Sequence, residues 1–154
     1  MKRYIKSFVL TMLLLAFVFA VFSVSSAQEE KPNVAVLLPG SVEFFSVQRR
    51  GIDQAAEDYG LDIIYADAEW DAGKQLSQVE NFIVRGVDAV MLCTADNMGL
   101  IPAVQLCNEA NIPLITFTNA LGTDPEGKFP GVVSFIGRSE IGAGIILAEM
   151  AAQL

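Results

Sequence analysis

Two adjacent aromatic residues, Phe44 and Phe45, follow an apolar run that ends at Pro39 and Gly40. An aromatic ring offers a flat face on which the C–H groups of another ring can pack. Adjacent residues entering a helix point about 100° apart, so one ring can plug a core while the other faces outward. The pair is therefore a candidate stacking platform, although buried core positions are the ordinary place for aromatic residues.

Polar residues dominate the segments that follow the other strand-like runs. These segments are 67–71, 93–97, 118–119 and 137–139. Hydroxyl and amide groups both donate and accept hydrogen bonds, which is what the hydroxyls of a ligand require. Such groups beside an exposed aromatic ring are typical of a site for a carbohydrate-like molecule.

The elements that must position these residues follow one another in a regular order. Apolar runs of strand length occupy 34–38, 62–66, 88–92, 113–117 and 132–136, and helical spacing occupies about 45–59 and 74–85, with a third helix behind Asp96 or Asn97 as its cap. The runs are apolar throughout, as in strands covered on both faces. We predict an α/β fold with a doubly wound parallel sheet, in which ligands bind at the carboxyl ends of the strands.

Helical spacing also assigns an inward face to each helix. The predicted faces are Val47, Gly51, Ala55 and Tyr59 for the first, Leu76, Val79 and Ile83 for the second, and Leu100, Ala103, Cys107 and Ala110 for the third. Pro102 is tolerated in the first turn of the third helix because its missing N–H has no helical partner there.

Residues 1–27 have the pattern of a secretory signal peptide. A basic start precedes an apolar segment from about Phe8 to Phe22, and Ser25, Ser26 and Ala27 supply small residues for cleavage. An uncleaved membrane anchor is the alternative, but the segment is shorter than the roughly 20 residues that a spanning helix needs. We expect an exported protein in the periplasm, without direct membrane insertion after cleavage.

Composition narrows the function classes. Removal of residues 1–27 leaves seven basic and eighteen acidic residues, a net charge of −11, which disfavours nucleic acid as a partner. The chain has no histidine, so it lacks the usual general base and the commonest metal ligand. We predict a protein that is not an enzyme and that needs no cofactor or metal. Cys93 and Cys107 are compatible with a disulfide or with two buried thiols.

The acidic stretch around the only tryptophan allows several interpretations. Asp67, Glu69 and Asp71 alternate as in a calcium loop, but Gly73 is one position late and Gln78 stands where a bidentate Glu belongs. The same residues could form a glycosidase pair, or a solvated loop that caps a helix. Trp70 is equally compatible with a cleft wall and with an ordinary surface position.

Four segments, in this order along the chain, carry a family resemblance. They read FFSVQRRGIDQAAEDYG, DAEWDAGKQLSQVENFIVRGVDAVML, NEANIPLITF and VSFIGRSEIGAG. The chain resembles the N-terminal lobe of the type I periplasmic sugar-binding proteins, the ribose-, arabinose- and galactose-binding group of ABC importers. Phe44 and Phe45 match the family's N-P-F-F segment, whose aromatics stack on the sugar, while Val42 and Glu43 replace its Asn and Pro.

The resemblance implies a site, a function and partners. A sugar or similar small polyhydroxylated ligand would be bound by Ser41, Glu43, Phe44, Phe45, Cys93, Thr118 and Asn119. The function implied is ligand capture for ABC-type import, with a membrane permease as partner. The alternative is a periplasmic ligand-sensing module that partners a chemoreceptor or histidine kinase.

The resemblance also implies a domain organisation. Residues 28–137 would be the N-terminal sugar-binding lobe, and residues 138–154 the hinge crossing and the first helix of a second lobe, capped by Ser139. That helix places Ile141, Ile145, Ala148 and Ala152 on one face. We expect a fragment or a truncated reading frame rather than a one-lobe protein, because an apolar helix face without cover is a liability.

Overall fold

The computed structural model describes residues 30–153, so the predicted signal peptide lies outside the described residues. The elements are, in chain order, β1 (Asn33–Leu38), α2 (Glu43–Tyr59), β2 (Asp62–Asp67), α3 (Ala72–Val84), β3 (Ala89–Leu92), α4 (Ile101–Glu109), β4 (Leu114–Phe117), β5 (Ser134–Ile136) and α5 (Glu140–Ala151). Strands and helices alternate up to β4, as the apolar runs and helical spacing predict.

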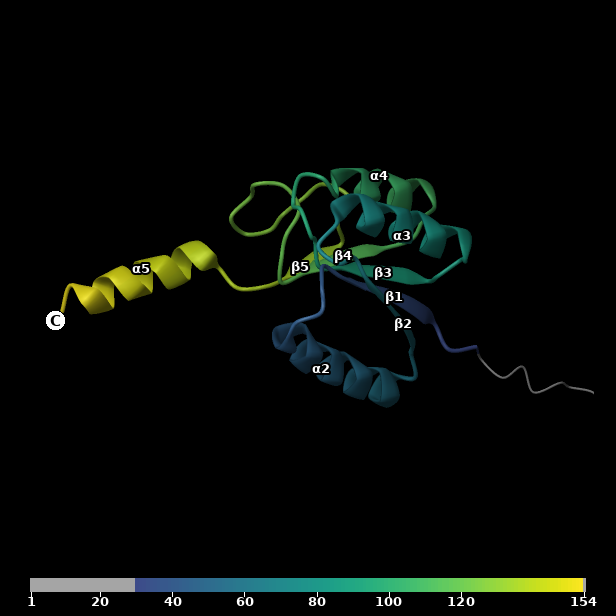
Figure 1. Ribbon diagram of the computed structural model, residues 1–154, viewed down its shortest axis with the longest axis horizontal. Helices are drawn as coiled ribbons and strands as arrows, with labels where there is room; N and C mark the ends of the chain where they lie inside the picture. Colours follow the sequence, from purple (N-terminus) through teal and green to yellow (C-terminus); the bar gives the residue numbers. More distant parts are fainter. Residues whose placement is uncertain (1–29, 154) are drawn as a thin grey trace, which may run out of the picture. The chain divides into compact units, whose positions relative to one another are not determined.

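The strands form one parallel sheet in the order β2-β1-β3-β4-β5. β1 pairs with β2 along its whole length, from Asn33 opposite Asp62 to Leu38 opposite Asp67. Helices α3 and α4 cover one face of the sheet, and α2 covers the other (Figure 1). The predicted doubly wound parallel sheet is confirmed, and β5 is shorter than the run 132–136 predicts.

Two apolar cores lie on opposite faces of the sheet. Successive residues of β1 alternate between them, as the strand period of two requires. The α3/α4 core includes Ala35, Leu37, Val79, Phe82, Val90, Leu92, Ala103, Val104 and Cys107, and the α2 core consists of Val34, Val36, Leu38, Phe45, Cys93 and Phe117 with partly buried neighbours. The predicted inward residues of α3, Leu76, Val79 and Ile83, belong to or pack against the α3/α4 core.

The predicted inward face of α2 is wrong. Val47 is 51% exposed and Tyr59 is 79% exposed, whereas Phe45 and Ala56 are buried. The reason is that the ring of Phe45, which the predicted inward set leaves out, enters the α2 core, and this turns Val47 and Tyr59 away from the sheet. From Phe45 the helical period carries the inward face through Ile52 to Ala56.

The predicted cap of α4 is also displaced. The Asp96 carboxylate accepts hydrogen bonds from the backbone N–H groups of Met98 at 2.8 Å and Gly99 at 2.7 Å. These bonds close a turn before the helix, and α4 begins later, at Ile101. Pro102 does lie in the first turn, where its missing N–H leaves no helical bond unmade.

A buried glutamine joins α3 to the loop after β3. Gln75 is 0% exposed. Its amide donates to the carbonyl of Cys93 at 2.9 Å and accepts from the backbone N–H of Ala95 at 2.8 Å. Since a buried backbone group without a partner is costly, this side chain satisfies two groups that the sheet leaves free.

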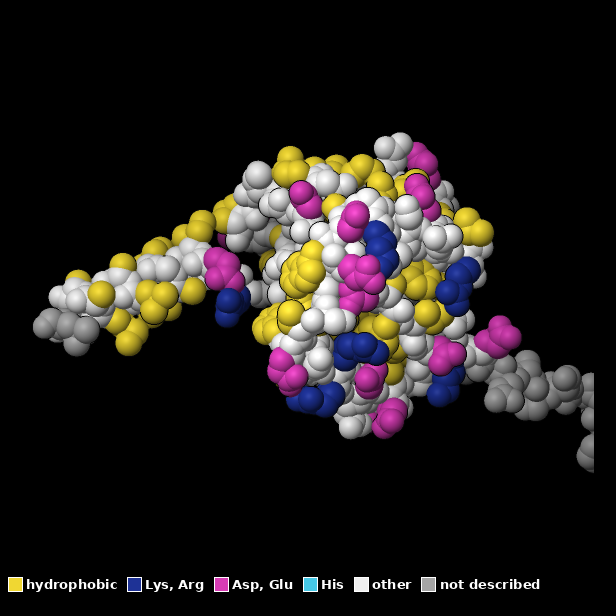
Figure 2. Space-filling view, viewed as in Figure 1, with side chains coloured by type: hydrophobic (Ala, Val, Ile, Leu, Met, Phe, Trp, Pro, Cys, Tyr) yellow, Lys and Arg dark blue, Asp and Glu magenta, His cyan; other side chains and the backbone are white. Residues whose placement is uncertain are grey.

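Helix α5 has a capped start and an uncovered surface. Ser139 accepts a hydrogen bond from the N–H of Gly142 at 3.1 Å, as predicted, but no residue of α5 is buried. Its exposed apolar side chains appear in yellow along its length (Figure 2). Within residues 30–153 no helix is long and apolar enough to cross a membrane. Residues 31–154 group into one compact unit, and the predicted boundary after residue 137 stays a prediction.

We expect Gln75→Leu to lower the free energy of unfolding by about 2–5 kcal/mol, because it leaves the Cys93 carbonyl and the Ala95 N–H buried without a partner. Urea-induced unfolding followed by circular dichroism measures the change.

Gln78→Leu on the same helix is the matched control. Gln78 donates to the Asp67 carbonyl at 2.8 Å, but its own carbonyl oxygen is buried without a partner among the described residues. The substitution removes one hydrogen bond and one orphaned acceptor together, so we expect a loss of at most about 1 kcal/mol. Equal losses for the two variants would contradict the bridging role of Gln75.

Candidate ligand-binding site

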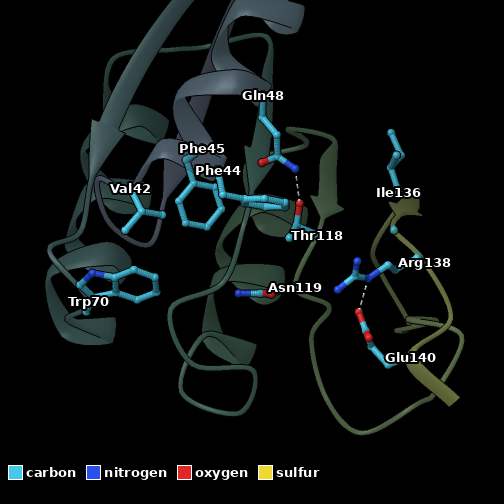
Figure 3. A pocket seen from close by; sticks show the side chains of 11 residues that line it. Val42, Phe44, Phe45, Gln48, Trp70, Thr118, Asn119, Ile136, Arg138 and Glu140 are labelled. Carbon is cyan, nitrogen blue, oxygen red and sulfur yellow. Dashed lines mark hydrogen bonds and ion pairs between the residues drawn. The ribbon is translucent and has the colours of Figure 1, made fainter. Parts of the chain in front are cut away.

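A cavity of about 570 Å³ lies at the carboxyl ends of the strands. Its lining comes from the loops after β1, β2, β4 and β5 and from the first turns of α2 and α5. The lining residues are Val42, Phe44, Phe45, Gln48, Trp70, Thr118, Asn119, Ile136, Gly137, Arg138 and Glu140 (Figure 3). This is the edge at which parallel α/β sheets bind ligands.

Phe44 and Phe45 divide the two roles that adjacent aromatics can take. Phe45 is 5% exposed and packs in the α2 core, while Phe44 is 55% exposed. Their ring centroids lie 5.3 Å apart at an interplanar angle of 77°, an edge-to-face contact. Phe45 therefore fills the core and contacts Phe44, and Phe44 remains exposed at the cavity.

Trp70, which the sequence leaves open between cleft and surface, lies at the cavity (Figure 3). Its ring centroid is 6.2 Å from that of Phe45, and its side chain is exposed. The indole rests directly on Gly40, where a Cβ atom would collide with it. The absence of a side chain at Gly40 is thus what lets Trp70 extend the aromatic wall.

The loop that carries Trp70 is tied to the loop after β1. The Ser41 hydroxyl donates to the Asp67 carboxylate, and the other carboxylate oxygen accepts from the N–H of Glu69 at 2.7 Å. These two bonds, the one from Ser41 first, lower the pKa of Asp67 below its ordinary value. Glu69 and Trp70 both have left-handed backbone, with φ of 53° and 65°.

The polar side of the cavity is built after β4. The Gln48 amide donates to the Thr118 hydroxyl at 2.7 Å, and the Asn119 amide donates to the Thr94 carbonyl at 3.0 Å. Thr118 has a φ of 60°, a conformation that β-branched residues rarely adopt. The Gln48 carbonyl oxygen is buried without a partner among the described residues, so Gln48 orients Thr118 and offers no accessible acceptor itself.

Charged groups at the rim are already paired. Arg138 Nε lies 2.6 Å from Glu140 Oε1, and both side chains are largely exposed. Within residues 30–153 no group of three or more His, Cys, Asp or Glu side chains is placed to hold a metal ion. Asp71 instead caps α3 by accepting from the N–H of Lys74 at 2.9 Å, which favours the helix-cap interpretation of the acidic stretch.

The structure brings together four of the residues predicted to bind ligand: Phe44, Phe45, Thr118 and Asn119. Three others are not in the lining. Ser41 uses its hydroxyl on Asp67, Glu43 is exposed in the first turn of α2, and Cys93 is buried in the α2 core.

Besides Trp70, which the sequence left open, the predicted set missed six lining residues: Val42, Gln48, Ile136, Gly137, Arg138 and Glu140. Gln48 carried a usable signal, because it lies one helical turn beyond Phe44 and therefore on the same side of α2.

The two cysteines are free and buried. Burial raises the pKa of each thiol to about 11, because the charged thiolate loses its hydration. The disulfide alternative is therefore wrong for this structure, and the two thiols are core residues.

A second hollow, of about 700 Å³, adjoins the first along Thr118 and Asn119. Its other lining residues include Thr94, Asp96, Asn97 and Asp124, and its one aromatic residue, Phe135, is partly buried. The first cavity has two exposed aromatic side chains, Phe44 and Trp70, so it is the stronger candidate for a ring-shaped ligand.

The Ser41–Asp67 bond predicts a pH dependence of stability. Since the folded state lowers the pKa of Asp67 below 3.8, its carboxylate adds stability that is complete above about pH 5 and is lost as the pH falls through the folded pKa. We expect Asp67→Asn and Ser41→Ala each to flatten the acid limb of a plot of unfolding free energy against pH. In the Asp67→Asn background, Ser41→Ala should add little, and full additivity would contradict the coupling.

Because Thr118 has a left-handed backbone, we predict that its replacement by glycine costs little stability. Thr118→Gly removes the bond from Gln48, worth about 0.5–1.5 kcal/mol, but relieves about 1–2 kcal/mol of backbone strain. We expect the free energy of unfolding to stay within about 1 kcal/mol of the parent in urea titrations.

Thr94→Gly serves as its control, because Thr94 is buried, is not left-handed, and donates to the Ala120 carbonyl at 3.2 Å. Its loss should be clearly larger, about 2 kcal/mol or more. A Thr118→Gly variant as unstable as Thr94→Gly would show that no strain is stored at Thr118.

Comparison with known proteins places residues 34–154 in the family described as periplasmic binding protein domain. A ribose import binding protein of Bacillus subtilis (strain 168) is 36% identical over 73 residues, which are 47% of this chain and 24% of that protein. The chain thus matches about a quarter of this relative's length.

Solved structures have the same fold. An ABC transporter solute-binding protein from Bacillus halodurans C-125, with bound myo-inositol, aligns with a TM-score of 0.72 at 26% identity, over 83% of this chain and 43% of that one. The fructose-binding periplasmic domain of a hybrid two-component system aligns with a TM-score of 0.70 at 20% identity, over 79% and 39% of the two chains.

Proposed function

The chain belongs to the periplasmic binding protein family, and on that premise we propose that it binds a sugar or similar small polyhydroxylated ligand for ABC-type import. Binding without catalysis is the activity proposed. Two similar proteins support this choice: a ribose import binding protein and a transporter solute-binding protein with bound myo-inositol.

One observation carries the proposal: the cavity at the sheet edge places an exposed aromatic ring opposite hydroxyl and amide groups. Phe44 supplies the ring face, and Thr118 and Asn119 supply the polar groups (Figure 3). A sugar or cyclitol ring has an apolar C–H face and a rim of hydroxyls. Such a ring can stack on Phe44 while its hydroxyls bond to Thr118 and Asn119.

The other predicted residues take supporting roles in this proposal. Phe45 contacts Phe44 edge to face, and Phe45 and Cys93 are both buried in the α2 core. Ser41 holds the β2–α3 loop through Asp67, and Glu43 stands beside the cavity in the first turn of α2. A ligand contact by Ser41 would require its bond to Asp67 to be exchanged.

The proposed setting is the periplasm, with a membrane permease as the partner that receives the ligand. The acidic composition disfavours a nucleic-acid partner. The alternative, a sensing role, is supported only by a shared fold with one domain of a two-component system, at 20% identity. A ribose import binding protein is 36% identical over its matched segment, so import is the function we propose.

Substitution of Phe44 tests the stacking role. Titration of the chain with D-ribose, D-allose and myo-inositol, followed by two-dimensional NMR, should show saturable shifts for at least one of them. We expect Phe44→Ala to weaken that binding by about 2- to 10-fold, since an aromatic stacking contact contributes about 0.5–1.5 kcal/mol.

Tyr59→Ala is the matched control for Phe44→Ala. Tyr59 is an exposed aromatic on the same helix, outside the cavity lining, and its removal should leave the binding unchanged. If none of these polyols produces saturable shifts in the unaltered chain, the proposed function is wrong.

A further inference from the structure

The aromatic residues of the cavity gather at one end. Trp70, Val42 and the two phenylalanines lie there, the Arg138–Glu140 pair and Ile136 lie toward the other end, and Asn119 lies between them (Figure 3). A bare polyol can stack its C–H face on Phe44, but its rim carries hydroxyls and gains nothing from further apolar side chains. The ligand that fits both ends is itself divided into a polar and an apolar part.

The apolar end has more exposed surface than a stacking platform needs. Val42 is 43% exposed, Phe44 55% and Trp70 58%, and all three line one cavity. Single exposed apolar side chains are ordinary, but a contiguous group of them at a cavity marks a binding surface. Since a ring stacked on Phe44 occupies that side chain, Val42 and Trp70 are available to another part of the ligand.

The indole is held in place before any ligand arrives. It rests on Gly40, lies beside Phe45 at 6.2 Å between ring centroids, and is carried by a left-handed backbone. The Ser41–Asp67 bond ties the end of β2, just before the loop that carries Trp70, to the loop after β1. A side chain that is already ordered loses little conformational freedom on binding, so its contact area is converted to affinity more fully.

We propose that the Trp70–Val42 end of the cavity binds an apolar substituent of the ligand. The ligand class is then a polyhydroxylated ring that bears a methyl or aryl group, such as an O-methylated cyclitol or a glycoside. This inference rests on the proposed function, because it assigns the remainder of the same cavity.

The test compares matched pairs of probes that differ only in the substituent. The pairs are D-ribose with methyl β-D-ribofuranoside, D-galactose with phenyl β-D-galactopyranoside, and myo-inositol with a mono-O-methyl inositol. A buried methyl group is worth about fourfold in affinity, and a phenyl group should give about tenfold or more. Calorimetry or NMR titration of the whole chain measures the ratio of affinities within each pair.

Spectroscopic signals of Trp70 can detect contact between the ligand and its indole ring. It is the only tryptophan in the sequence, so the chain has a single indole fluorescence signal and a single indole N–H resonance. We expect the substituted member of a pair to shift both signals and the parent polyol to shift them much less. This measurement uses the unaltered chain and does not depend on whether a variant folds.

Two substitutions separate the ends of the cavity. Trp70→Ala should bring the affinity ratio within each pair close to one, and Trp70→Phe should keep part of it. Phe44→Ala should weaken both members by a similar factor and leave the ratio in place, because Phe44 is assigned to the common ring.

The outcomes distinguish this inference from the proposed function. If parent polyols bind and their substituted partners bind no tighter, or if Trp70→Ala preserves the ratio, the apolar subsite is overturned while sugar binding stands. An indole signal that changes with protein concentration and not with any probe would assign Trp70 to contact with a second copy and would also overturn it. Failure of every probe to bind would remove the proposed function and this inference together.

Discussion

The structure depends first on the pairing of β1 with both of its neighbours. β1 is hydrogen-bonded to β2 along its whole length and to β3 on its other side, and its residues alternate between the two cores. Because the pairing is parallel, the carboxyl ends of these strands reach the same edge of the sheet. The loops that line the cavity converge there as a consequence of this parallel pairing, which fixes the position of the ligand site at that edge.

A parallel sheet leaves backbone N–H and C=O groups without partners where its strands end. In this structure, side chains form hydrogen bonds with several of these groups. Gln75 serves the segment after β3, Gln78 the Asp67 carbonyl, and Asn119 the carbonyl of Thr94. The Ser41–Asp67 bond adds a link between neighbouring loops. The polar residues at the edge therefore divide into those that hold loops and those that face the cavity. Residue type alone does not separate them, since both groups consist of amides, hydroxyls and carboxylates.

The fold was predictable from the sequence, and the site only in outline. Uninterrupted apolar runs identify buried parallel strands, so the sheet and its carboxyl edge follow from local pattern. The inward face of α2 did not follow, because helical spacing allows more than one apolar face on this helix, and the choice depends on the core that receives the ring of Phe45. The position of Trp70 at the cavity could not be predicted from the sequence either. Its place beside Phe45 depends on Gly40, 30 positions earlier in the numbering, which no periodicity links to it.

The two buried thiols can report on transient local unfolding of the two cores. Cys93 belongs to the α2 core and Cys107 to the α3/α4 core, so each face of the sheet holds one thiol. Because burial raises both pKa values to about 11, the thiols are almost entirely un-ionised at neutral pH, and both are shielded from reagents. Their alkylation rates therefore measure how often each core opens. Two different rates would mean that the layers on either side of the sheet separate independently, and a single rate that they come apart in one event.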